Sequence, residues 1–404
     1  MSSLKSLKKI YDKLKSDRIR GTLLATAEYL GMPKDIVRMD TNGYCNIRCI
    51  MCNQSSRTAK KQFMPLDNYK KIIDTFASTT RMLYLSCAYE PLITPHFSEY
   101  LAYAKQKRIP HVSFCTNALL LNKELITCMV DLQIDEIIIS FNGFCESDYN
   151  RIMEGSNYQR VCANLKALCE YKREKNAAKP HIRLNTVLLK SNLEHTGQIF
   201  DFLVEYDIDT VQFRELMLLT DQNNSDAVKE EMLSNLTPAE YEEVVHNINI
   251  LTEKLKLAGK EIILPAAFWE YKQQEQPLAA PAPSDSPSGT TSDTQSGATP
   301  DISSGTTPDI PSDTPPVQSE QNLNLQKKHN SSKSSCSIPC FSYWIDRDGG
   351  VRVCGFDDNG IIGNALLQSS KELKARRKAF QKMALSGECS RELCTMNIDS
   401  SKVL

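Results

Sequence analysis

Apolar positions form two kinds of pattern between residues 36 and 214. Short apolar runs rich in β-branched residues predict strands at residues 36–40, 82–86, 111–115, 136–141, 182–188 and 210–214. Between these runs, apolar residues three and four positions apart predict helices, for example at residues 66–76, 123–132, 158–171 and 194–205. Six strand–helix units in succession favour an α/β fold with a parallel sheet and right-handed crossovers.

The pattern stops near residue 275. From there to residue 335 the chain is mostly Pro, Ser, Thr, Asp and Gly, with an eight-residue near-repeat beginning at Ser288, Ser296 and Ser304. Such a segment has too few apolar side chains to offset its ordering entropy, so it predicts a disordered linker at 275–335.

With this linker, we expect the chain to have four parts. They are an N-terminal helical segment (1–34), a main domain (35–274), the linker (275–335) and a small C-terminal domain (336–404). Residues 4–19 form an amphipathic, basic stretch. We expect it to be a helix packed on the main domain, and binding to a membrane surface is the alternative.

Composition narrows the classes of function. The 404 residues carry 48 Lys and Arg against 49 Asp and Glu, so charge gives no reason to expect nucleic-acid binding. The sequence shows neither an apolar stretch near the ~18 residues of a membrane helix nor a signal peptide, which predicts a cytoplasmic protein without stable membrane insertion. For the fourteen cysteines, that compartment predicts metal ligands or reduced core thiols rather than disulfides.

Cys45, Cys49 and Cys52 carry the clearest chemical signal. Soft thiolates select iron–sulfur, zinc or cuprous centres, and three of them leave one iron of a four-iron cluster open. Zinc sites usually show Cys-x2-Cys pairs with a fourth ligand nearby, whereas here the first gap is three residues and no His lies between residues 45 and 60. Asn46 and Arg48 interrupt the apolar pattern, which argues against incidental core cysteines.

With this Cys-x3-Cys-x2-Cys spacing directly after the first predicted strand, the chain resembles the radical S-adenosylmethionine (SAM) superfamily over about residues 36–220. The resemblance implies a partial (β/α)6 barrel and a 4Fe-4S cluster held by the three cysteines, with SAM on the open iron. It implies reductive cleavage of SAM to a 5′-deoxyadenosyl radical, which abstracts hydrogen from a peptide or small-molecule substrate. A low-potential donor such as a flavodoxin or ferredoxin would supply the electron.

Two positions near the cysteines match the family's SAM contacts. Glu90 follows the second strand where the family has a Gly-Gly-Glu-like segment that meets the amino group of SAM, although Tyr89 replaces a glycine. The alternative for Glu90 is a capping carboxylate at the start of a helix. Met51 occupies the position that packs against adenine in the family, or else it shields the cluster. Thr116-Asn117 resembles the family's turn after the third strand.

Three further residues complete the SAM contacts that the resemblance implies. Ser140 and Asn142 resemble the family's Ser-x-Asp-Gly segment, with an uncharged amide in place of the Asp. Arg183, in the fifth strand, has the fork geometry that recognises a carboxylate such as that of SAM. A structural salt bridge is the equal alternative for Arg183.

A second group of cysteines follows the linker: Cys336, Cys340, Cys354, Cys389 and Cys394. Asp348-Gly349 predicts a hairpin turn between residues 343–345 and 351–353. In this order the segment resembles the SPASM or twitch domain of radical SAM enzymes, which implies an auxiliary iron–sulfur cluster on Cys336, Cys354, Cys389 and Cys394. Cys340 is then spare or an alternative ligand, and a zinc ribbon is the alternative site.

The remaining cysteines, 87, 115, 128, 145, 162 and 169, lie in predicted strands or helices, where core packing is expected. The histidines show no metal-binding spacing, and neither a phosphate-binding loop nor a nucleophile elbow is present. We therefore interpret the chain as a radical SAM oxidoreductase or maturase. A non-catalytic iron–sulfur electron-transfer or scaffold protein, or a zinc-binding module, is the alternative that Tyr89 and Asn142 keep open.

Overall fold

A computed structural model describes residues 34–52, 62–86, 88–216, 225–265, 342–354 and 361–385. Its central element is a 10-stranded sheet in the order β12-β11-β10-β1-β3-β4-β5-β7-β8-β9. The strands are β1 (Asp35–Met39), β3 (Thr80–Leu85), β4 (His111–Thr116), β5 (Glu136–Ser140), β7 (His181–Leu188), β8 (Thr210–Glu215), β9 (Glu261–Ile263), β10 (Ser342–Ile345), β11 (Gly350–Arg352) and β12 (Ile361–Asn364). The six predicted strands are β1, β3, β4, β5, β7 and β8, and all pair in parallel as expected.

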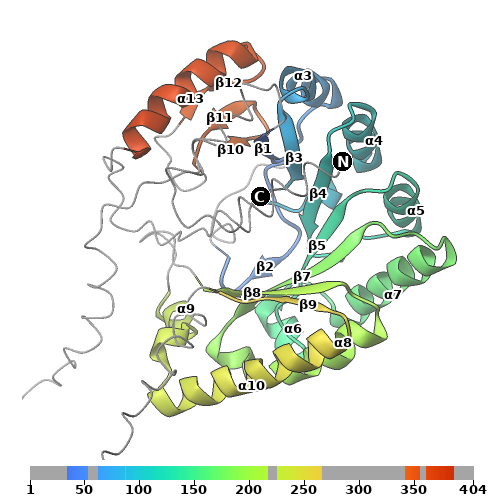
Figure 1. The fold of residues 1–404 in the computed structure, drawn as a ribbon, viewed down its shortest axis with the longest axis vertical. Coiled ribbons are helices and arrows are strands. Elements are labelled where there is room, and N and C mark those ends of the chain that lie inside the picture. Colours follow the sequence, from blue (N-terminus) through green and yellow to red (C-terminus); the bar gives the residue numbers. More distant parts are fainter. Residues whose placement is uncertain are drawn as a thin grey trace, which may run out of the picture. The chain divides into compact units, whose positions relative to one another are not determined.

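Helices lie along the outer face of the sheet, as Figure 1 shows for α3, α4, α5 and α7 in turn. The helices are α3 (Leu66–Phe76), α4 (Phe97–Gln106), α5 (Lys123–Asp131), α6 (Glu146–Ile152), α7 (Tyr158–Glu174), α8 (Ile199–Glu205), α9 (Asp226–Glu230), α10 (Pro238–Leu257) and α13 (Ser370–Leu385). Side chains of Asn122, Asn157 and Thr237 cap α5, α7 and α10 by accepting a backbone N–H of the first turn.

The helix expected at residues 194–205 begins only at Ile199. Two short 3₁₀ turns precede it, at Lys190–Asn192 and Thr196–Gln198. The Asn192 side chain accepts the Leu189 N–H, and the Thr196 hydroxyl donates to the Leu193 carbonyl. These local bonds compete with the α-helical pattern, so the chain keeps a loop at the carboxyl end of β7.

The strands bury one face under the helices and leave a more polar face inside the curve of the sheet. In β7, Ile182, Leu184 and Leu188 are buried, whereas Arg183 and Asn185 between them are half-buried. The charges of Arg214 on β8 and Arg38 on β1 are close enough to influence each other. A flat sheet would hold these strands five spacings, or ~24 Å, apart, so the sheet must curl as a partial barrel does.

The predicted C-terminal hairpin is present and continues the barrel's own sheet. β10 and β11 pair antiparallel around Asp348-Gly349, with Gly349 at φ +82°, and Asp346 Oδ1 accepts the N–H groups of Gly350 and Asp348. β10 then pairs in parallel with β1, with Val37 opposite Tyr343. The sequence indicated the hairpin but not its place beside β1, and it missed β9 as a further parallel strand.

The N-terminal helix predicted at residues 4–19 and the linker predicted at 275–335 lie outside the described residues. Among the helices that the structure describes, none has the length and apolar character needed to cross a bilayer.

Candidate active site

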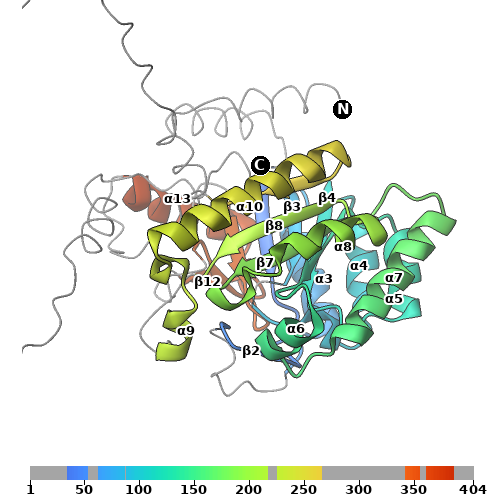
Figure 2. The same cartoon turned by 90° about the horizontal axis from the view of Figure 1, so that it is seen from below.

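The cysteine loop follows β1 and is fixed to the end of α6. Two residues, Arg48–Cys49 (β2), pair antiparallel with Met153–Glu154 (β6), and the Ile50 N–H donates to the Ile152 carbonyl at 3.0 Å. Figure 2 shows β2 beside α6 in this arrangement. The Cys49 Sγ lies 3.5 Å from the thioether of Met153. The loop thus has a defined backbone at the carboxyl edge of the parallel strands, where ligands of such folds bind.

The three cysteines of this loop are half-buried thiols, and none forms a disulfide. Burial is the main cause that raises the pKa of Cys45 to about 11 and that of Cys49 well above its ordinary value, and the charges of Glu90 and the neighbouring thiols contribute to both shifts. Thiolates in this setting need a cation to stabilise them, and cluster iron supplies that charge. The donor set therefore fits a bound iron–sulfur cluster.

The sulfur atoms of Cys45, Cys49 and Cys52 do not all lie within 4.8 Å of one another. Tetrahedral zinc with bonds of ~2.3 Å would bring thiolates to ~3.8 Å from each other, whereas sulfur atoms that each bind a different iron lie farther apart.

Glu90 is buried, 3% exposed, and its carboxylate is engaged by the protein. Oε1 accepts the Leu92 N–H at 3.1 Å and the Thr116 hydroxyl at 2.6 Å, and Oε2 accepts the Asn117 N–H at 2.7 Å. The first of these bonds caps the 3₁₀ turn Pro91–Ile93, which is the capping role considered as the alternative. A direct contact of Glu90 with SAM stays a prediction.

Asn117 connects the hydrogen bonds of Glu90 to the cysteine loop. Its side-chain amide donates to Asn46 Oδ1 at 2.8 Å and lies 3.9 Å from Cys45 Sγ. Asn42, at the start of the loop, donates to the Glu90 carbonyl at 2.7 Å. Buried, mutually satisfied polar groups of this kind hold a single geometry, so the turns after β3 and β4 position the cysteine loop.

Glu90→Gln should remove a pH dependence of stability. Burial raises the pKa of Glu90 from 4.5 to about 7, against the lowering effect of its three hydrogen bonds. Between these values the folded protein keeps a proton that the unfolded chain releases, so wild-type stability falls as pH rises. The fall attributable to Glu90 is about 3 kcal/mol and should be absent in the variant, as measured by urea unfolding from pH 4.5 to 7. Glu99→Gln, at an exposed carboxyl on α4, should keep the wild-type profile, and parallel profiles for wild type and Glu90→Gln would contradict this expectation.

Ser140 and Asn142 lie at the end of β5, close to the cysteine loop. The Ser140 hydroxyl is 3.4 Å from Cys115 Sγ. Asn142 Oδ1 accepts the Val187 N–H at 2.9 Å, and its Nδ2 lies 2.9 Å from the sulfur of Met153. Both ends of this amide therefore bind the protein itself, and Asn142 joins β7 to the end of α6.

Close packing against α6 explains why a glycine, Gly143, follows Asn142. A Cβ atom on Gly143 would lie 2.4 Å from the backbone nitrogen of Tyr149, so no larger residue fits there without moving the helix. Met51 is half-buried in the turn after β2, next to Cys52.

Arg183 forms a structural salt bridge, which is the alternative to binding the SAM carboxylate. Its guanidinium pairs with Glu136 at 3.1 Å and donates to Gln212 Oε1 at 3.2 Å. Desolvation lowers the pKa of Arg214, and the positive charges of Arg183 and Arg38 lower it further. The inner face of the sheet is therefore basic.

Arg38 itself is held between two aromatic rings on the same face. Its guanidinium carbon lies 4.7 Å from the ring centre of Tyr84 and 4.9 Å from that of Trp344. Trp344 belongs to β10, so the C-terminal hairpin contributes to the inner face of the barrel.

Comparison with known families agrees with this geometry. Residues 39–203 match the Radical SAM superfamily. This segment is a radical SAM domain. The superfamily implies a 4Fe-4S cluster and SAM as cofactors, and the three loop cysteines fit the cluster as described above.

The radical SAM domain is also similar to two curated proteins. The "tungsten-containing aldehyde ferredoxin oxidoreductase cofactor-modifying protein" of Pyrococcus furiosus is 24% identical over 239 residues, which cover 58% of this chain and 63% of that protein. GTP 3′,8-cyclase of Chlorobaculum tepidum is 25% identical over 202 residues, or 49% of this chain and 58% of that protein. The chain thus spans about six-tenths of the length of these relatives.

Solved structures share the fold at low sequence identity. Streptococcus suis SuiB bound to S-adenosylmethionine has a TM-score of 0.58 at 13% identity, covering 92% of this chain and 75% of that one. The anSMEcpe protein with bound AdoMet has a TM-score of 0.55 at 14% identity, covering 86% and 83%.

The predicted auxiliary ligands lie mostly outside the described residues. Cys336, Cys340, Cys389 and Cys394 are not among them. Cys354 is half-buried and follows β11. Because β11 runs opposite to β10 and therefore to β1, Cys354 lies toward the amino end of β1.

Sequence reasoning missed one group of side chains beside the radical SAM domain's central loop. Cys162 and Cys169 are buried on α7, as core packing predicts. Cys145 is instead half-buried and lies next to His195 and Asp148. Cys145 and Asp148 show a Cys-x2-Asp spacing at a helix start, but His195 comes from a loop 50 residues later, which spacing alone does not connect.

Proposed function

We propose that this protein is a radical SAM enzyme that abstracts hydrogen from a peptide or small-molecule substrate. The observation that carries the proposal is the loop of Cys45, Cys49 and Cys52, which lies at the carboxyl edge of the barrel inside the segment that matches the family. When bound, the cluster and SAM supply the chemistry: one electron cleaves SAM to methionine and a 5′-deoxyadenosyl radical. The electron comes from a low-potential flavodoxin or ferredoxin in a reducing cytoplasm.

The chain's own residues hold and enclose this chemistry. Glu90, Thr116 and Asn117 fix the turns beside the loop, and Asn142 joins β7 to α6. A site enclosed by such fixed groups keeps water away from reactive species and orients the substrate's C–H bond. In our proposal, SAM is contacted by Met51, Ser140, Glu90 and Asn142.

The basic inner face supports a substrate that carries a carboxylate. Arg38, Arg183 and Arg214 face the inside of the curve, with Glu136 as the counter-charge nearest Arg183. Arg recognises carboxylates in a two-pronged manner. Peptides offer such groups, and among the similar structures, SuiB was solved with its precursor peptide SuiA and anSMEcpe with the Cp18Cys peptide.

An auxiliary iron–sulfur cluster on Cys336, Cys354, Cys389 and Cys394 forms part of the proposal. It would accept the electron that a substrate radical releases, so the net reaction would be an oxidation or a cross-link. A zinc ion on the same thiols would hold the domain together without transferring electrons.

The test is anaerobic turnover of the full chain. The protein is reconstituted with iron and sulfide, reduced in the presence of SAM, and assayed for 5′-deoxyadenosine and methionine in equal amounts. We expect both products, and a cluster whose electron paramagnetic resonance signal changes on addition of SAM. A fully loaded cluster that is indifferent to SAM and yields neither product would contradict the proposal and favour an electron-transfer or scaffold protein.

A further inference from the structure

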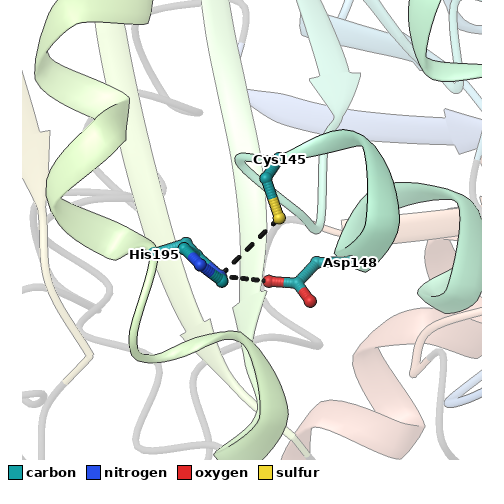
Figure 3. A group of neighbouring side chains, drawn as sticks. All are labelled: Cys145, Asp148 and His195. Atoms are coloured by element: carbon teal, nitrogen blue, oxygen red, sulfur yellow. Dashed lines mark hydrogen bonds and ion pairs between the residues drawn. The ribbon is translucent and has the colours of Figure 1, made fainter.

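Cys145, Asp148 and His195 form a compact group of potential metal ligands outside the cysteine loop. Figure 3 shows the three side chains pointing toward one another from the start of α6 and the loop after β7. His195 Nδ1 lies 2.7 Å from Asp148 Oδ2 and 3.6 Å from Cys145 Sγ. Among the residues that the structure describes, this is the one group of three His, Cys, Asp or Glu side chains whose ligand atoms all lie within 4.8 Å.

Local structure brings these side chains together before any ion binds. Cys145 is the N-cap of α6 and Asp148 lies in its first turn, so the two residues, three positions apart, share one face. The loop with His195 is tied to the same region, because Asn192 Nδ2 donates to the Asn142 carbonyl at 2.9 Å. The group is thus preorganised rather than assembled from mobile parts.

The geometry argues against a nucleophilic cysteine activated by histidine. In a Cys–His–Asp relay, the imidazole binds the nucleophile through one nitrogen and the orienting carboxylate through the other. Here the same nitrogen, His195 Nδ1, faces both the Cys145 sulfur and the Asp148 carboxylate. Convergence of three donors on one point is the arrangement of metal ligands.

We propose that Cys145, Asp148 and His195 bind a zinc-class divalent ion. A tetrahedral ion with ~2.0 Å bonds to nitrogen and oxygen and a ~2.3 Å bond to sulfur places its ligand atoms ~3.3 to 3.6 Å apart. The observed N–S separation of 3.6 Å already matches this geometry. The N–O pair, at 2.7 Å, opens by roughly half an ångström when the ion replaces the shared proton. The Cys145 thiol loses its proton to solvent on binding.

Three protein ligands leave the fourth position of the ion for water. The second carboxylate oxygen of Asp148 lies 3.9 Å from Arg151 Nη2. Arg151 also donates to the Ser191 carbonyl at 3.4 Å, so it orients the Asp148 ligand and the loop together. Half-burial of Cys145 and His195 gives an ion access from solvent.

The ion would lock the loop after β7 onto α6. The seven residues of α6 span ~10 Å between this site and Met153, which contacts Cys49. The site therefore stiffens the rim of the barrel close to the cysteine loop. It requires neither cluster nor SAM, so it stands independently of the proposed function.

The test is zinc binding by the full chain with its iron–sulfur sites loaded. Reconstituted protein is equilibrated with zinc, gel-filtered, and analysed for zinc and iron, and the zinc is examined by X-ray absorption. We expect one zinc per chain with one sulfur and three nitrogen or oxygen neighbours. Cys145→Ser should weaken zinc binding at least about a hundredfold at unchanged iron content, because the serine keeps the Asp148–His195 pair but removes the thiolate.

Two controls separate this site from the other thiols. Cys128→Ser, at a half-buried cysteine on α5, should bind zinc as the wild type does. His195→Gln should lose zinc as Cys145→Ser does, and zinc should raise the melting temperature of wild type but of neither variant. Equal zinc content in wild type and Cys145→Ser, or zinc with three or four sulfur neighbours, would overturn the proposal.

Discussion

Alanine at Cys45, Cys49 and Cys52 together should abolish 5′-deoxyadenosine formation, with a fall of at least about 1000-fold. In the proposed site each of these thiolates would bind a different iron, so their loss would remove the cluster that passes the electron to SAM. Cys49→Ala alone should have nearly the same effect, because its backbone keeps the pairing with Met153 while its sulfur is gone. Product is measured by anaerobic turnover with reductant and SAM.

The loss must be separated from unfolding and from damage to other thiols. Cys128→Ser is the matched control, because it removes a half-buried thiol outside the cysteine loop. Cys128 lies on α5, and its sulfur is 3.9 Å from the Ser98 carbonyl oxygen. It should retain wild-type turnover. Circular dichroism should report the same fold for all variants. Wild-type rates in a triple variant that contains no cluster in its barrel would refute the assignment of these cysteines.

The strands of the barrel could be predicted closely because each is a short apolar run with turn residues on both sides. The predicted strand at residues 136–141 is observed at Glu136–Ser140, and the predicted helix at 66–76 is observed at Leu66–Phe76. The cysteine spacing predicts a cluster site for the same reason, since the three proposed ligands lie within one loop. Local sequence is sufficient where the feature itself is local.

Features built from distant segments could not be predicted in this way. β10 pairs with β1 although the barrel and the linker separate the two strands in the sequence, and neither strand's sequence specifies the other as its neighbour. The contact of Glu90 with SAM stays a prediction, whereas the hydrogen bonds of its carboxylate with Thr116 and Asn117 depend on the parallel pairing of β3 with β4, about 26 residues later in the chain. His195 likewise reaches Asp148 from 47 residues away.

The C-terminal helix is joined to the barrel by a buried ion pair that follows from this long-range pairing. Arg377 on α13 is 1% exposed and Asp35 on β1 is 2% exposed. Arg377 Nη1 lies 2.7 Å from Asp35 Oδ1, across 342 residues of sequence. The guanidinium also stacks on Tyr343 of β10 at 4.4 Å, so one side chain contacts both strands of the β1–β10 junction.

Arg377→Met should destabilise the protein by about 3–5 kcal/mol, because it leaves the Asp35 carboxylate buried without its partner. The melting temperature should fall by roughly 10 °C. Lys378→Met, on the exposed side of the same helix, should change stability by less than about 0.5 kcal/mol. The double variant Asp35→Leu/Arg377→Met should recover most of the loss, since a buried pair replaced by apolar side chains no longer holds an unpaired charge. If Arg377→Met melts like Lys378→Met, the ion pair does not hold the C-terminal helix to the barrel.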